Sequence, residues 1–585
     1  MNFAGIYHRP ESEYAFLLDS ETMHIRLRTA KNDIDKVEIV YGDPYAIRSL
    51  NSDWYAKKIP MNKGLSTDVY DYWTISVKEP KHRLAYGFYL TDHEGNQVLY
   101  NDQGIQLNYS EAYLKNENNY FRMPFFQKID MFKAPEWVRN TVWYQIFPER
   151  FANGDPSLNP EGTKEWDSTV HPGRQDFYGG DLQGILDHLD HLVDLGVNGI
   201  YFNPIFKAPS NHKYDTEDYF EIDPHFGTKE LFKKLVQEAH KRGIKVMLDA
   251  VFNHMGDKSP QWQDVIKNGA NSKYASWFHI HDFPVHYTPT DNFEFANDAN
   301  YETFDYTPHM PKLNTANPEV QKYLLSIATY WIKEFDIDAW RLDVANEIDH
   351  HFWRAFHDAT YALKPDFYIL GEIWHTSQPW LQGDQFTGVM NYAYTEAIKG
   401  HFIEKRISAT QMKNELNRQL MLYNDLADSM MFNVLDSHDT VRIKTLAHDD
   451  MDLVKQIFAF TFIQPGTPSI YYGTEYGMTG ENDPDDRKPM VWDEKLQDHD
   501  FYQFMQKLIE VRKQIADKLN VKDLKWEIVD DNKGQIELSF DSIHAIFNTG
   551  KKEFKLNLDK NNVLIQSKFD GQTLANKGFV LYQKD

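Results

Sequence analysis

The segment DAWRLDVA at residues 338–345 predicts a short buried β-strand that ends in charged side chains. Seven more short apolar segments share its character, at 141–147, 197–205, 244–254, 367–374, 386–394, 431–439 and 468–475. Helical stretches lie between most of them, and this alternation is typical of parallel βα units. Eight such units over about 370 residues predict an α/β fold, a (β/α)8 TIM barrel with insertions.

One helix is expected after Asn317 and Pro318. The asparagine side chain can cap a helix, and the missing N–H of proline costs nothing at the first helical position. Beyond this start, apolar residues recur on one helical face: Val320, Leu324, Ile327 and Trp331. The segment therefore predicts a helix that packs its apolar face on the barrel.

Strand-rich sequence flanks the predicted barrel on both sides. Residues 1–130 alternate polar and apolar side chains in short runs, such as MHIRLRTA at 23–30, which predicts an N-terminal β-sandwich. The barrel is expected over 131–518, and the longest gap between its strands predicts a small inserted subdomain at about 255–312. Short strands return over 519–585 and predict a C-terminal β-sandwich.

The composition excludes several kinds of partner and chemistry. The 585 residues include 62 Lys and Arg against 87 Asp and Glu, a net charge of −25, so nucleic acid and anionic membranes are poor partners. The absence of cysteine excludes disulfides and thiol catalysis. No long apolar run and no signal-peptide pattern occurs at MNFAGIYHRPESEY, so a cytoplasmic location is expected.

Carboxylates lie at the ends of four of the predicted strands, the third, fourth, fifth and seventh: Asp249, Asp343, Glu372 and Asp439. Active sites of TIM barrels form at this end of the strands. A single aspartate there is usually a loop cap, but four at one rim repel one another and indicate acid–base chemistry. Glycoside hydrolysis needs such a set, in which one carboxylic acid protonates the leaving oxygen and a carboxylate attacks or activates water.

Arginine and histidine accompany these carboxylates. Arg341 lies two residues before Asp343 on one strand, so both side chains point to the same face and the guanidinium favours the ionised carboxylate. His254 and His438 end two strands beside carboxylates, where they are expected to bind sugar hydroxyls, although a single histidine is more often a structural core residue. Neither histidine has the spacing of a zinc site. Asp249 is expected to play a supporting role by orienting Arg341 or neighbouring backbone.

Four segments resemble the signature segments of the α-amylase family of glycoside hydrolases, in the family's order: DAVFNH (249–254), DAWRLDVANE (338–347), GEIW (371–374) and LDSHD (435–439). Accessory segments are similar as well: VNGIYFNPIF (197–206), MPKLN (310–314) and GTPSIYYGTEYG (466–477). The VANE ending, MPKLN and the extra N-terminal domain resemble the neopullulanase, cyclomaltodextrinase and maltogenic amylase subfamily.

The resemblance implies a catalytic role for three residues. Asp343 would be the nucleophile, Glu372 the general acid that then acts as base, and Asp439 the group that binds sugar hydroxyls near the cleaved bond. The residues implied or expected to bind substrate are Tyr214, His254, Arg341, Asn346, Glu347, Trp374, His438, Asp483, Arg487 and Tyr45. Among these, Trp374 is expected to stack on the leaving sugar, and Asp483 and Arg487 to contact sugars on the non-reducing side. For the segment that holds those two, a solvated acidic loop is the alternative.

A calcium site is also implied by resemblance, with the ligands Asn153, Asp155, Asn159, Gly179 and Asp181. Hard oxygen ligands of this kind suit Ca²⁺. Leu158 stands where an oxygen ligand is expected, and Asn159 replaces an aspartate, so weak or purely structural binding is expected. An ordinary Asx turn is the alternative.

The predicted activity is that of a retaining endo-type α-glucan hydrolase. It would cleave α-1,4 and some α-1,6 bonds of cyclodextrins, pullulan and maltooligosaccharides, with transglycosylation. An exo-acting oligo-1,6-glucosidase is the alternative enzyme, and it generally lacks the N-terminal sandwich. A catalytically inert amylase-like interaction domain is disfavoured because Asp343, Glu372 and Asp439 are all present.

The resemblance further implies a homodimer formed through the N-terminal domain. That domain would pack over the partner's barrel and narrow its cleft. Tyr45 is then expected to meet a cyclodextrin ring together with Trp374 of the partner, although it is equally compatible with an ordinary exposed tyrosine.

Overall fold

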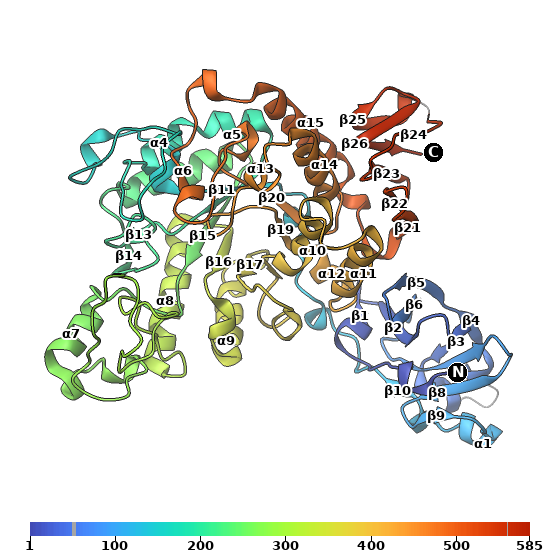
Figure 1. The fold of residues 1–585 in the computed structure, drawn as a ribbon. Coiled ribbons are helices and arrows are strands. Elements are labelled where there is room, and N and C mark those ends of the chain that lie inside the picture. Colours follow the sequence, from blue (N-terminus) through green and yellow to red (C-terminus); the bar gives the residue numbers. More distant parts are fainter. Residues whose placement is uncertain (49–53, 559, 585) are drawn as a thin grey trace.

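The computed structural model describes residues 1–48, 54–558 and 560–584, and Figure 1 shows three parts. A central barrel with its helices carries an N-terminal β-domain, in blue at lower right, and a C-terminal β-domain, in red at upper right. Within the described residues, no helix has the length and apolarity needed to cross a bilayer.

All eight predicted barrel strands are present, as β11 (Trp143–Ile146), β12 (Gly199–Phe202), β15 (Lys245–Ala250), β16 (Ala339–Leu342), β17 (Tyr368–Gly371), β18 (Gly388–Val389), β19 (Phe432–Val434) and β20 (Thr467–Tyr471). They pair in parallel in the order β18-β17-β16-β15-β12-β11-β20-β19. A parallel bridge between Met390 and Phe432 joins the two outer strands, so the sheet closes. The predicted TIM barrel is confirmed.

Apolar side chains fill the interior of the barrel below its rim. Trp143 of β11 and Tyr368 of β17 come from opposite sides and stack with ring centroids 6.0 Å apart. Met247 of β15 is paired in register with Ala339 of β16, which is paired with Tyr368. Because side chains alternate along a strand, the next inward positions after this apolar layer are the polar groups of the rim.

Amphipathic helices surround the barrel: α4 (Leu182–Asp187), α5 (Leu189–Leu195), α6 (Lys229–Lys241), α8 (Pro318–Phe335), α9 (His350–Tyr361), α10 (Tyr392–Phe402), α11 (Ala409–Leu420), α14 (Met451–Phe462) and α15 (His499–Ile515). Single helical turns are α1 (Glu111–Leu114), α2 (Glu136–Arg139), α3 (Pro148–Phe151), α12 (Asp425–Asp428) and α13 (Ile443–Leu446). The start of α8 is as predicted, since Asn317 accepts a backbone N–H and the four apolar residues are buried.

The predicted insertion follows β15 and lies at lower left in Figure 1. It contains the helix α7 (Pro260–Asn268) and two 3-10 turns at Gly269–Asn271 and Ala275–Trp277, and isolated bridges such as Thr303 to Pro311 join its irregular parts. A short antiparallel pair, β13 (Phe206–Lys207) and β14 (Asp218–Ile222), precedes it in the chain. The insertion therefore forms a second wall beside the rim of the barrel.

The N-terminal domain is the predicted β-sandwich. One sheet consists of β1 (Ala15–Leu17), β2 (Thr22–Ala30), β6 (Tyr70–Lys78) and β5 (Asn62–Ser66). The other consists of β4 (Lys58–Pro60), β3 (Ile34–Gly42), β7 (Ala85–Asp92), β8 (Gln97–Asn101), β9 (Gly104–Gln106) and β10 (Phe121–Arg122). Apolar side chains from both sheets, among them Met23, Ile25, Val37 and Phe88, form one buried cluster.

The C-terminal strands form one hydrogen-bonded set of β21 (Leu524–Asp530), β22 (Gln535–Phe540), β23 (Ile543–Asn548), β24 (Phe554–Lys555), β25 (Val563–Phe569) and β26 (Thr573–Gln583). One group of their apolar side chains joins the main core, and a second group with Leu574 and Val580 forms a separate cluster. Asn417 of α11 links all three parts, because its side chain donates to the carbonyl of Ser66 (2.8 Å) and accepts from Trp526 (2.9 Å).

Candidate active site

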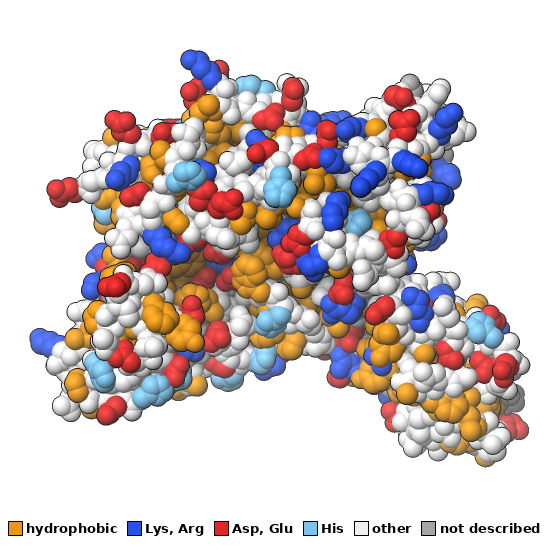
Figure 2. Space-filling view, viewed as in Figure 1, with side chains coloured by type: hydrophobic (Ala, Val, Ile, Leu, Met, Phe, Trp, Pro, Cys, Tyr) orange, Lys and Arg blue, Asp and Glu red, His pale blue; other side chains and the backbone are white. Residues whose placement is uncertain are grey.

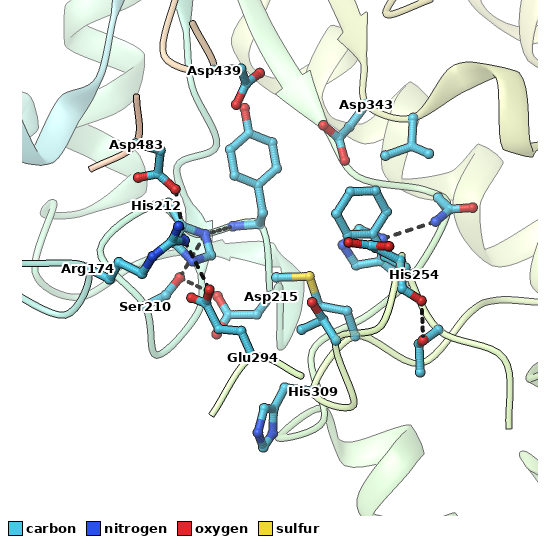
Figure 3. Close-up of a pocket in the computed structure, with 18 of the residues that line it drawn as sticks. Arg174, Ser210, His212, Asp215, His254, Glu294, His309, Asp343, Asp439 and Asp483 are labelled. Carbon is cyan, nitrogen blue, oxygen red and sulfur yellow. Dashed lines mark hydrogen bonds and ion pairs between the residues drawn. The ribbon is translucent and has the colours of Figure 1, made fainter. Parts of the chain in front are cut away.

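A cleft of about 1150 Å³ opens at the carboxyl ends of the barrel strands. Figure 2 shows the molecule hollowed between the inserted segment, at lower left, and the barrel. The predicted catalytic residues Asp343, Glu372 and Asp439 all line the cleft, and Figure 3 shows Asp343 and Asp439 on one side of it. The structure thus brings together carboxylates from three strands that are far apart in the sequence.

Arg341 is fully buried between three carboxylates, those of Asp249, Asp343 and Glu372. Its Nη1 donates to Asp249 (2.9 and 3.1 Å) and to Oδ1 of Asp343 (2.7 Å). Its Nη2 lies 3.0 Å from Oε2 of Glu372. The predicted contacts of Arg341 with Asp343 and Asp249 are confirmed, and one guanidinium serves three carboxylates.

The electrostatic balance at Asp343 differs from the expectation that Arg341 keeps this carboxylate ionised. Burial raises the pKa of Asp343 well above its ordinary value, and the charges of Glu372 and Asp249 act in the same direction. Arg341 opposes the shift but is shared by all three carboxylates. Burial also raises the pKa of Asp249 to about 6, against the effect of Arg341. The buried carboxylates Asp343 and Asp249 therefore tend to hold a proton, and acid–base chemistry can use that proton.

Glu372 is held by two N–H donors. The backbone N–H of Val344 donates to its Oε2 (2.9 Å), and the indole N–H of Trp374 donates to its Oε1 (3.0 Å). Val344 has φ of 46°, a left-handed conformation that is strained for a β-branched residue. One face of Trp374 stacks on Tyr392 at 3.8 Å, and the side chain is still 46% exposed. Its other face is therefore open to the cleft, where stacking on the leaving sugar stays a prediction.

A buried hydrogen-bond network positions His438 and Tyr214. The Tyr214 hydroxyl lies 2.6 Å from Nε2 of His438 and donates to Asp249 (3.0 Å). Gln145 contacts Nδ1 of His438 (2.7 Å) and donates to Asn203 (3.0 Å). Burial lowers the pKa of His438 well below its ordinary value, so this imidazole is neutral near pH 7.

Asp439 is joined to the predicted sugar contacts of the last barrel loop. Its Oδ2 lies 3.1 Å from Nε2 of His438, and its Oδ1 accepts from Arg487 (3.3 Å). Arg487 also forms an ion pair with Asp483 at 3.0 Å, and both residues line the cleft. Their segment is therefore part of the cleft wall.

His254 lines the cleft on the side of the insertion, stacked on Phe304 with centroids 5.2 Å apart. Its Nε2 is buried and has no hydrogen-bond partner among the described residues, and its binding of a sugar hydroxyl stays a prediction. Asn346 and Glu347 lie exposed at the same rim, and Glu347 forms an ion pair with Lys312 at 3.2 Å.

Tyr45 lies away from the cleft of its own chain. The described residues that line the cleft begin at Arg174, so the N-terminal domain contributes none of them. Tyr45 is 53% exposed on that domain, with the guanidinium of Arg83 4.5 Å from its ring centroid. A contact of Tyr45 with substrate would therefore require the cleft of another chain.

The residues of the expected calcium site lie together. The amide of Asn153 donates to Asn159 (3.0 Å), and Gly179 approaches both so closely that a Cβ would clash. The buried Oδ1 of Asn153 has no partner among the described residues, as a ligand oxygen should. Both oxygens of Asp181, however, accept backbone N–H groups at 2.6 to 3.2 Å, and Asp155 caps the following turn. The donor set fits Ca²⁺ only in part.

Sequence reasoning missed three residues that shape the site. Gln145 and Asn203 are polar residues inside the apolar segments TVWYQIF and IYFNPI, and this interruption was the available signal. Val344 carries no such signal, because valine gives no indication of a positive φ. Its strain follows from the turn that directs its N–H toward Glu372.

A family model for the α-amylase catalytic domain matches residues 145–527, and one for the N-terminal ig-like domain matches residues 1–127. An intracellular maltogenic amylase of Bacillus subtilis is 50% identical over 571 residues, or 96% of this chain and 94% of the relative. A cyclomaltodextrinase of Geobacillus thermopakistaniensis is 52% identical over 514 residues, covering 88% and 85%. A solved cyclomaltodextrinase matches with TM-score 0.89 at 40% identity over the whole of both chains. The chain belongs to the α-amylase family of glycoside hydrolases.

Proposed function

We propose that this protein hydrolyses α-glucosidic bonds of cyclodextrins, pullulan and maltooligosaccharides by a retaining mechanism. The observation that carries this proposal is the pair Asp343 and Glu372, from two neighbouring strands, held on one buried guanidinium. Relatives of this chain are named maltogenic amylase, cyclomaltodextrinase and neopullulanase, which supports the choice of α-glucan substrates.

In this proposal, Asp343 attacks the anomeric carbon, and Glu372 protonates the leaving oxygen. Glu372 then removes a proton from the water that hydrolyses the glycosyl-enzyme, and a sugar hydroxyl in place of water gives transglycosylation. Asp439 and His438 bind hydroxyls of the sugar that is attacked, and this contact strengthens as the ring flattens. The neutral state of His438 leaves the imidazole able to donate or accept.

The two carboxylate roles are separable with an activated substrate. Maltosyl fluoride needs no proton on its leaving group, so Glu372→Ala should still form the glycosyl-enzyme, and added azide should trap it as maltosyl azide. Asp343→Ala should form no azide adduct of retained configuration. An azide product of retained configuration from Asp343→Ala, or none from Glu372→Ala, would contradict the assignment.

We propose further that two chains associate through the N-terminal domain, so that Tyr45 reaches the partner's cleft. The position of Tyr45 outside its own cleft supports this arrangement. Tyr45→Ala should lower kcat/KM for cyclodextrin more than for maltotriose. Sedimentation of the wild type as a monomer, or equal effects on both substrates, would contradict it.

We also propose a metal site and a cellular location. The cluster around Asn153 binds Ca²⁺ weakly, in a structural role away from the reacting bond, which the orphan amide oxygen supports. The enzyme acts inside the cell, as the name of the Bacillus subtilis relative suggests. Fractionation of the producing cells tests the location.

A further inference from the structure

An alternating chain of charges runs along the cleft wall from the catalytic rim to the insertion after β15. Asp439 is paired with Arg487 (3.3 Å), and Arg487 with Asp483 (3.0 Å). Nη1 of Arg174 then bridges Oδ2 of Asp483 and Oε2 of Glu294, each at 3.0 Å. Figure 3 shows Arg174 between the two acidic groups.

The last link of this chain joins two separate walls of the cleft. Arg174 follows β11, and Asp483 follows β20, so both belong to the rim of the barrel. Glu294 belongs to the insertion after β15, and all three residues line the cleft. The Arg174–Glu294 ion pair therefore joins the insertion to the rim of the barrel across the cleft.

Local contacts hold both partners of the ion pair in place. The carbonyl of Arg174 accepts from the amide of Asn211 (2.8 Å). Beside Glu294, the ring of Phe293 stacks on His309 with centroids 4.0 Å apart, and the Glu294 N–H donates to Asn292 (3.1 Å). These contacts order the chain on either side of the ion pair, and opening it requires the two side chains to separate.

We propose that the Arg174–Glu294 ion pair limits how far an α-glucan extends beyond Asp483, and so disfavours long chains relative to short ones. The inference rests on the proposed function, in which Asp483 contacts sugars on the non-reducing side. A short substrate fits within the closed cleft, whereas a long chain has to displace the bridge. Because Arg174 and Glu294 are 54% and 40% exposed, the bridge is weak, and the discrimination is about two- to five-fold.

The test compares amylose with maltotriose as a ratio of kcat/KM values. Glu294→Gln should raise this ratio about two- to five-fold and lengthen the products released from amylose. The matched control is Glu415→Gln, which removes a similarly exposed ion pair with Arg418 on α11, outside the cleft. The control should keep the wild-type ratio.

Salt provides a second readout on the unmodified enzyme. At about 1 M NaCl the Debye length falls to about 3 Å, so the ratio of the wild type should rise toward that of Glu294→Gln. The ratio of Glu294→Gln itself should change little. An equal response of both proteins to salt would contradict the role of the bridge.

A covalent bridge tests the same idea in the opposite direction. The chain has no cysteine, so Arg174→Cys with Glu294→Cys gives the only two thiols, and a short bis-maleimide can join them. The double variant should show the raised ratio before cross-linking and a ratio at or below the wild-type value afterwards. A ratio that stays raised after complete cross-linking would overturn the inference.

Two outcomes separate this inference from the proposed function. Normal maltotriose hydrolysis with an unchanged ratio in Glu294→Gln, or an equal loss on both substrates, overturns only the role of the ion pair. Failure of the wild type to hydrolyse either glucan overturns the proposed function and this inference with it.

Discussion

The two ends of strand β16 carry buried aspartates in opposite electrostatic settings. Asp338, before the strand, contacts His240 (2.7 Å), Lys364 (2.9 Å) and Lys245 (3.0 Å). Asp343, after the strand, shares one arginine with two other carboxylates. One carboxylate therefore has an excess of cations, and the other has a deficit.

The pKa values follow this difference. Burial alone would raise the pKa of Asp338, but the hydrogen bond from His240 and the charges of Lys364 and Lys245 hold it well below the ordinary value. Burial raises the pKa of Asp343, and Arg341 does not compensate. The comparison teaches that the lower end of the barrel is arranged for stability and the upper end for chemistry, as is general for this fold.

The largest expected effect comes from replacing either aspartate by asparagine, because this separates the catalytic role of Asp343 from the structural role of Asp338. Asp343→Asn should lower kcat by about 10³-fold or more, because the nucleophile is lost. Its melting temperature should equal or exceed that of the wild type, since a buried carboxylate short of cations is removed. Asp338→Asn, the matched control at the other end of the strand, should keep kcat within a few-fold. Similar kcat losses in both variants would contradict the different roles of the two ends of β16.

The second prediction concerns stability and its pH dependence. Asp338→Asn should destabilise the protein by about 2 kcal/mol, since Lys245, Lys364 and His240 lose a shared carboxylate acceptor. A carboxylate with a depressed pKa stabilises the folded state above the pKa of the unfolded chain, and this is lost as pH falls. The difference in melting temperature between wild type and Asp338→Asn should therefore be full at pH 7 and shrink below about pH 4. A constant difference down to pH 3 would contradict the depressed pKa.

The third prediction concerns the pH–rate profile. Asp249→Asn removes one negative charge near Asp343 and leaves Arg341 with fewer partners, and both changes lower the pKa of Asp343. The acid limb of kcat/KM, where the nucleophile must be ionised, should move to lower pH by about half to one unit. An acid limb at higher pH would show that Asp249 acts mainly by orienting Arg341.

Much of this site was predictable from the sequence. Parallel barrel strands are short apolar runs, and the two-residue spacing of Arg341 and Asp343 places both on one face whatever the rest of the chain does. Because the carboxyl ends of parallel strands meet at one rim of the barrel, Glu372 and Asp439 are expected at the same rim. The net electrostatic balance was not predictable, because it depends on burial and on how many carboxylates share Arg341.

Contacts between loops that are distant in the sequence could not be predicted from local sequence patterns either. Nothing in the sequence around Glu294 indicates Arg174 as its partner, because the pair forms only where the insertion meets the rim. The network of Gln145 with His438 likewise joins two strands that the closed barrel brings together. Such contacts depend on loop conformations, which hydrophobic periodicity and secondary-structure propensity do not specify.

The smallest expected effect concerns calcium. Because both oxygens of Asp181 already accept backbone N–H groups, chelation should lower activity little and the melting temperature by less than about 5 °C. Differential scanning fluorimetry with and without EDTA measures this. A larger drop, restored by added Ca²⁺, would place calcium among the main sources of stability.

The most direct test of the central claim, that Asp343 is a nucleophile and Glu372 the acid and base, is the configuration of the first product. Proton NMR during the initial turnovers on maltotriose reports the anomer before mutarotation. Double displacement through Asp343 predicts that the newly formed reducing end is α. A product that is initially β would contradict a covalent role for Asp343, and with it this account of the site.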